Sequence, residues 1–183
     1  DALPKSIREN REAVAETIEN NVRRLIIDEQ PINPKYYEKM SELLDALIEQ
    51  RRHAALDYQK YLQQIVELTR KVKNPTEGAS YPNSLNTSAK RALYDNLRKN
   101  EELTLAIDRA VLASRQDDWR NNIFKVRRVR LAIKAVFERF SATENATVSN
   151  DGQVMDPFGE KYGGSVDTLA ANILELVKNQ HEY

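Results

Sequence analysis

The chain contains no cysteine, and this absence removes several classes of site. Disulfide bonds, cysteine-ligated zinc and iron–sulfur centres are excluded. The only two histidines, His53 and His181, are far apart in the sequence, so a transition-metal site is not expected either. The lack of cysteine also fits a reducing, cytoplasmic location.

Glycine and proline are scarce, with 5 and 6 residues among 183, so turns are few. Charged residues make up 31% and hydrophobic residues 40% of the chain, which is typical of long helices with solvated outer faces. No apolar run approaches the roughly 20 residues that span a bilayer, so we expect no membrane partner. The 28 basic and 28 acidic residues cancel. Attraction of the whole chain to nucleic acid is therefore not expected, and only a local patch could provide it.

Apolar residues recur at helical spacing almost throughout, which predicts an all-α helical bundle. Asn33-Pro34 is a strong start signal, because Asn caps helices and Pro is favoured at the first helical position. No Gly or Pro follows until Pro75. The pattern therefore predicts one very long helix over about 34–73, about 60 Å in length. Its polar middle, Arg51-Arg52-His53, is the expected weak point.

In the second half of the sequence, the pattern predicts shorter helices, with Thr87 and Ser165 as N-caps. One apolar stripe among them is especially regular: Val126, Val129, Ile133, Val136, Phe137 and Phe140. Residues 141–164 are polar and rich in turn formers, which predicts an irregular loop. We expect a single helical domain over 1–183, with sub-lobes at 1–75 and 87–183 as the alternative. Because the chain begins at Asp1 without Met, we expect it to be part of a larger subunit or a processed product.

No catalytic motif is present in the sequence. A phosphate-binding loop would need clustered Gly and a Lys-Ser or Lys-Thr pair, and a hydrolase triad would need His near a nucleophile. The segment 156–161 combines acids with a lysine, as Mg²⁺-dependent nucleases do. However, Glu160 directly precedes Lys161 and no strand holds them, so a solvated turn is the better interpretation. We predict no catalytic, cofactor-binding or metal-binding residue.

The strongest functional candidate is a basic segment around residues 119–134. It consists of Trp119, Arg120, Lys125, Arg127, Arg128, Arg130 and Lys134. These cations favour a contact with a phosphate backbone or with an acidic protein partner. The alternative is an ordinary solvated helix face, with Trp119 packed in the core. Asn121 and Asn122 could read DNA bases, but Asn pairs also mark helix starts.

Four segments carry a resemblance to a known family. They are VRRLIIDEQPINPKYYEKMSELLDALIEQRR (residues 22–52), YPNSLNTSAKRALYDNL (residues 81–97), VRLAIKAVF (residues 129–137, together with Trp119-Arg120) and ILELVKNQHEY (residues 173–183). In this order they resemble the C-terminal region of the R subunit (HsdR, the motor and nuclease subunit) of type I restriction endonucleases.

The resemblance implies a parent subunit with a Mg²⁺-dependent nuclease domain and two ATP-driven motor domains, in a bacterial or archaeal cytoplasm. That subunit assembles with a methyltransferase core of modification and specificity subunits, translocates DNA and cleaves it. The C-terminal region of the family is associated with holding the R subunit on this core. ATP and Mg²⁺ would belong to the parent's other domains, because their binding residues have no counterpart here. Duplex DNA and the chain's own motor domains are the alternative partners, and residues 141–164 match the family least.

Overall fold

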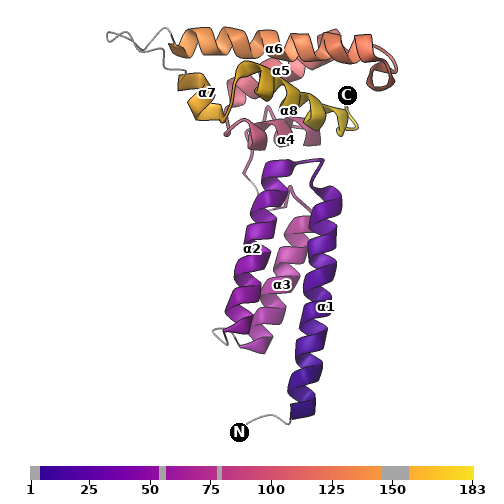
Figure 1. The fold of residues 1–183 in the computed structure, drawn as a ribbon, viewed down its shortest axis with the longest axis vertical. Coiled ribbons are helices and arrows are strands. Elements are labelled where there is room, and N and C mark those ends of the chain that lie inside the picture. The colour runs from indigo at the N-terminus through magenta and orange to yellow at the C-terminus, as the bar shows by residue number, and fades with distance from the viewer. Residues whose placement is uncertain (1–4, 54–56, 78–79, 146–156) are drawn as a thin grey trace. The chain divides into compact units, whose positions relative to one another are not determined.

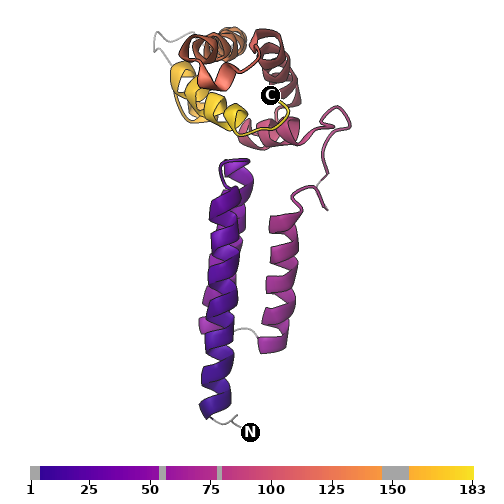
Figure 2. The same ribbon diagram turned by 90° about the vertical axis from the view of Figure 1, so that its right-hand side faces the viewer.

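The computed structural model describes residues 5–53, 57–77, 80–145 and 157–183. Every regular element in these residues is a helix, which confirms the all-α class (Figures 1 and 2). In chain order they are α1 (Lys5–Glu29), α2 (Pro34–Arg52), α3 (Tyr58–Lys73), α4 (Ser88–Asn96), α5 (Glu101–Ser114), the 3₁₀ helix η1 (Trp119–Asn121), α6 (Ile123–Asn145), α7 (Pro157–Tyr162) and α8 (Val166–Lys178). The chain divides into two compact units, residues 1–80 and 81–183, and each is described by itself.

The prediction of one helix over 34–73 is wrong, because α2 ends at Arg52 and α3 begins at Tyr58. The two helices fold back antiparallel, since the Tyr36 and Tyr37 hydroxyls at the start of α2 donate to Lys71 and Val72 carbonyls at the end of α3. Arg51 and Arg52 occupy the last turn of α2, where cations are favoured by the helix dipole. The apolar stripes of α2 and α3 follow one continuous period in the sequence because both helices face the same core.

The first unit is a three-helix bundle of α1, α2 and α3 (Figure 1). Its core includes Leu44, Tyr61 and Ile65, each no more than 1% exposed. The predicted start of α2 is confirmed, because Asn33 Oδ1 accepts the Tyr36 amide and Pro34 opens the helix.

A buried polar network joins the three helices of this unit. Glu19 of α1 is 4% exposed and receives two hydrogen bonds from Arg51 of α2, Nε to Oε1 at 2.7 Å and Nη2 to Oε2 at 3.2 Å. The Tyr61 hydroxyl of α3 also donates to Glu19 Oε1, at 3.0 Å. Burial, together with the hydrogen bond to this carboxylate, raises the pKa of Tyr61. One carboxylate thus fixes the register of all three helices.

The second unit packs α4, α5, α6, η1, α7 and α8 around one core. Trp119, Phe137 and Phe158 are almost fully buried there, and the Phe137 and Phe158 ring centroids are 6.0 Å apart in an edge-to-face arrangement. The predicted caps are confirmed: Thr87 accepts the Lys90 amide and Ser165 accepts the Thr168 amide.

The predicted irregular loop over 141–164 is wrong in part. Helix α6 continues to Asn145, and α7 occupies Pro157–Tyr162. Phe158 of α7 is buried in the core, where its ring centroid lies 4.6 Å from that of Tyr162, with the ring planes tilted by 41°. The composition of the segment did not predict helix α7, because a single buried aromatic in a polar segment is a weak signal for a helix. Asp156 lies outside the described residues, and in the same segment Lys161 lies over the Tyr162 ring.

The last residues of the chain are pinned into the second unit. The Tyr183 hydroxyl donates to Asp108 of α5 at 2.6 Å, and the Tyr183 main-chain oxygen accepts from Trp119 Nε1 and Arg115 Nη1. Next to it, the Glu182 carboxylate accepts from the Ser88 hydroxyl and the Ala89 amide at the start of α4. The segment thereby closes the core of this unit.

Glu182 gives this unit a specific pH dependence. Burial opposes ionisation, but the bonds from Ser88 and Ala89 outweigh it, so the pKa of Glu182 lies below its usual value. The stability from this group is present above the unfolded pKa and is lost as pH falls through the lower, folded pKa. Urea denaturation of the Glu182→Gln variant between pH 6 and about pH 3 should show a smaller acid-induced loss of stability than the wild-type chain. An equal loss in both would contradict this role.

Candidate docking surface on helix α6

The start of α6 is built by local hydrogen bonds. Asn122 Oδ1 accepts the amides of Phe124 and Lys125, at 3.0 and 3.2 Å, and Asn121 Nδ2 donates to Asp118 Oδ1 at 2.6 Å. Both asparagine side chains therefore act in the helix start, the second of the two roles that the sequence left open.

The inner face of α6 carries the apolar stripe that the sequence predicts. Val129, Ile133 and Phe137 are fully buried, Val136 is 8% exposed, and Val126 and Phe140 pack against the same core. Their partners are α5, α7, α8 and η1. Figure 1 shows α5, α7 and α8 on one side of α6, and its opposite side has no described neighbour within the second unit.

Trp119 lies in the core of the second unit, and the exposed Arg120 bonds to the chain's last segment. Trp119 is 2% exposed and bonds the Tyr183 main-chain oxygen at 2.9 Å. The Arg120 guanidinium donates to the Lys178 and Gln180 carbonyls and lies 5.2 Å from the Trp119 ring centroid. Both residues tie the chain's last segment to η1.

Lys125 and Lys134 also have partners within the unit. Lys125 Nζ donates to the Asp117 carbonyl at 2.7 Å. Lys134 Nζ lies 2.8 Å from Asp167 of α8 and 3.8 Å from Glu138. The hydrogen bond to Asp167 raises the pKa of Lys134 and lowers that of Asp167. Lys134 therefore fastens α6 to α8.

Three of the predicted contact residues face solvent. Arg127, Arg128 and Arg130 are exposed, and none has a carboxylate of the described residues within ion-pair distance. Arg130 still experiences Asp167 electrostatically, because it helps to lower the pKa of that carboxyl. The structure thus separates the seven predicted residues into four that hold the fold and three that are available at the surface.

Sequence inspection missed the apolar part of this surface. Ile123, Phe124 and Leu131 are 77%, 80% and 55% exposed, although all are large hydrophobic residues. Phe124 and Leu131 are seven residues apart and therefore lie on the same side of the helix. That spacing, on the side opposite the buried stripe, is the signal that could have revealed them. The solvent-facing arginines together with Ile123, Phe124 and Leu131 are called the α6 outer face below.

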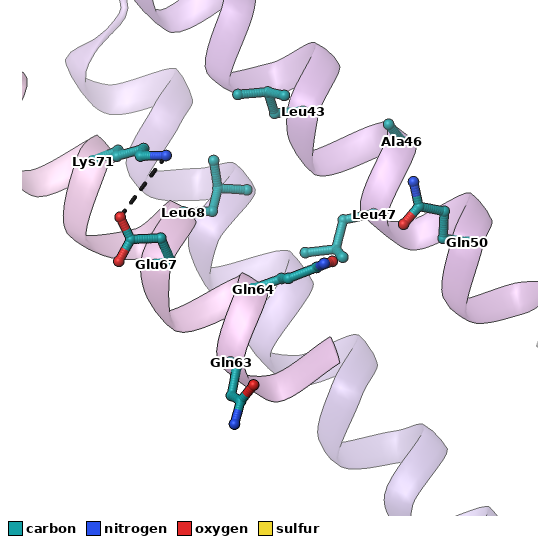
Figure 3. A pocket seen from close by; sticks show the side chains of 9 residues that line it. All are labelled: Leu43, Ala46, Leu47, Gln50, Gln63, Gln64, Glu67, Leu68 and Lys71. Atoms are coloured by element: carbon teal, nitrogen blue, oxygen red, sulfur yellow. Dashed lines mark ion pairs between the residues drawn. The ribbon is translucent and has the colours of Figure 1, made fainter. Parts of the chain in front are cut away.

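A second surface is a groove between α2 and α3 of the first unit (Figure 3). It has a volume of about 400 Å³ and is lined by Leu43, Ala46, Leu47, Gln50, Gln63, Gln64, Glu67, Leu68 and Lys71. Its polar rim consists of glutamine amides and of Glu67 and Lys71, which pair with each other at 3.8 Å. The rim therefore has no net charge with which to select a partner.

No metal-binding geometry is found in the part of the chain that the structure describes. No cluster of three or more His, Asp or Glu side chains there is arranged to hold a metal ion. Among the same residues, no helix combines the length and apolarity that crossing a membrane requires. Comparison with known proteins adds no identity, because no protein-family model, no curated protein and no solved structure matches this chain.

Proposed function

We propose that the chain is a non-catalytic docking module, which holds the R subunit of a type I restriction enzyme on its methyltransferase core. The resemblance of residues 22–52, 81–97, 129–137 and 173–183 supports the family. The observation that carries the docking role is the α6 outer face, where Phe124 and Leu131 are exposed beside arginines that have no ion-pair partner among the described residues. Exposed aromatic and arginine side chains on one face are typical of protein interfaces.

The apolar side chains favour a protein partner over duplex DNA. A phosphate backbone is bound by cations, whereas burying Phe124 and Leu131 stabilises only a contact that removes them from water. Of the six cations that the sequence assigned to DNA or a partner, three are already used inside the unit. The remaining three suit charge contacts at the rim of a protein interface.

The test is a sedimentation-velocity titration of the 183-residue chain with a methyltransferase complex of modification and specificity subunits. The chain is expected to comigrate with the complex, and a Phe124→Ser variant should bind at least about tenfold more weakly. Val66→Ser is the matched control, because Val66 is 53% exposed but lies on α3. No comigration of the wild-type chain at tens of micromolar would reject the proposal.

Contact with duplex DNA is the second candidate, favoured by the three exposed arginines, which have no ion-pair partner in the part of the chain that the structure describes. It predicts that the affinity of the chain for a DNA duplex falls steeply with salt, and that Arg127→Glu with Arg130→Glu flattens this dependence. Phe124→Ser should then leave DNA binding unchanged. Absence of any salt-sensitive DNA affinity would eliminate this candidate.

A further inference from the structure

The exposed apolar residues of α6 have the spacing of a helix that packs along another helix. Phe124 and Leu131 are about 10 Å apart along the axis, at seven residues and 1.5 Å per residue. Arg128 lies between them, and the small Ala135 follows Leu131 by one turn. This seven-residue interval places the two apolar side chains on one line along the helix, where a second helix can pack against both.

The charge on this face is strongly one-sided. Three arginines of this face, Arg127, Arg128 and Arg130, are exposed, and helix α6 contains six basic residues against two acidic ones, Glu138 and Glu144. Glu138 pairs with Lys134, and Lys134 also pairs with Asp167. Arg127 and Arg128 have no described acid within ion-pair distance. Covering them with a partner removes water from their guanidinium groups, and this cost must be offset by carboxylates of that partner.

The same charge argues against a second copy of this chain as the occupant. A two-fold contact through α6 would bring two sets of arginines together, and like charges at an interface are repulsive. The α2–α3 groove offers no comparable preference, because its Glu67 and Lys71 neutralise each other. The α6 outer face therefore selects a partner of opposite charge.

We infer that the α6 outer face binds an acidic amphipathic helix of a partner protein. Phe124 and Leu131 anchor its apolar side, and Arg127 and Arg128 pair with its carboxylates. This inference rests on the proposed docking function and adds the chemistry of the partner. The surface predicts a partner helix with apolar residues at seven-residue repeats and with Glu or Asp beside them.

The experiment uses two synthetic helical peptides with the same leucine repeat. One has glutamate and the other has lysine at the flanking positions. Each is titrated into the full chain at low salt by calorimetry. The glutamate peptide is expected to bind and the lysine peptide is not. Phe124→Ser with Leu131→Ser should weaken binding of the glutamate peptide at least about tenfold, and so should Arg127→Glu with Arg128→Glu. The arginine reversal should also create affinity for the lysine peptide.

A matched control lies on α3, where Val66 and Arg70 are both exposed. Val66→Ser with Arg70→Glu should leave peptide affinity unchanged. The inference is overturned by equal binding of both peptides, by glutamate-peptide binding that ignores Phe124 and Leu131, or by no binding up to about 1 mM. If the chain joins the methyltransferase complex but does not bind the glutamate peptide, only the inference of an acidic partner helix is overturned. If the chain binds the peptide but not the complex, only the restriction-enzyme assignment is overturned.

Discussion

Replacing Glu19 with alanine is expected to lower the free energy of unfolding of the three-helix unit by about 3–5 kcal/mol. The carboxylate is 4% exposed, and the side chain of its partner Arg51 is 11% exposed. Without Glu19, the guanidinium of Arg51 keeps only the exposed Glu12 at 3.9 Å, and the hydroxyl of Tyr61 keeps only the Ala15 carbonyl at 3.4 Å. A charge held away from water that loses its close partner is costly, and this cost exceeds what the ion pair itself contributes.

The unfolding of the two units can be followed separately in one sample. Trp119 is the only tryptophan and lies in the second unit, so its fluorescence reports that unit alone, whereas far-ultraviolet circular dichroism reports both. In urea, Glu19→Ala should shift part of the dichroism transition to lower denaturant while the fluorescence transition stays in place.

Glu12→Ala is the matched control for Glu19. Glu12 approaches the same Arg51 at 3.9 Å, but its side chain is 65% exposed. Exposed pairs contribute about 1 kcal/mol or less, so this variant should unfold almost as the wild-type chain does. A loss below about 1 kcal/mol in Glu19→Ala would show that the buried network does not hold the three helices together.

Replacing Trp119 with alanine is expected to destabilise the second unit by about 3–5 kcal/mol. The indole is 2% exposed within the core, so its removal leaves a cavity. Loss of Nε1 also removes a hydrogen bond to the Tyr183 main-chain oxygen. Because the variant has no tryptophan, its unfolding is followed by circular dichroism.

Phe124→Ala provides the surface comparison for Trp119→Ala. Phe124 is 80% exposed, and substitutions at such positions usually change stability by no more than about 0.5 kcal/mol. The two aromatics are only five residues apart, but their substitutions should have different effects. Trp119→Ala should lose stability, whereas Phe124→Ala should keep its stability and lose binding. A large loss of stability in Phe124→Ala would contradict its role as a surface residue.

Local signals in the sequence predict three helix starts correctly. Asn33, Thr87 and Ser165 each cap the helix that they precede, because a short polar side chain before an apolar repeat has one favourable use. The division between α2 and α3 could not be predicted in this way. Their apolar repeats continue in phase, and only packing of both helices on α1 favours folding back over one extended helix.

The candidate site was only partly predictable for a related reason. Residue type shows that Arg120, Lys125 and Lys134 are cations, but their partners are distant in sequence or are main-chain carbonyls. Their use inside the fold therefore depends on tertiary structure. Conversely, Phe124 and Leu131 resemble core residues by type, and only the position of α5 and α8 on the other side of α6 leaves them exposed.

The most direct test of the central claim is the affinity of the chain for the methyltransferase complex, compared between the wild type and Phe124→Ser by sedimentation velocity. If the α6 outer face is the docking surface, the wild-type chain binds, Phe124→Ser binds at least about tenfold more weakly, and Val66→Ser binds as the wild type does. Equal affinities for all three chains, or no binding of the wild type, would contradict the account.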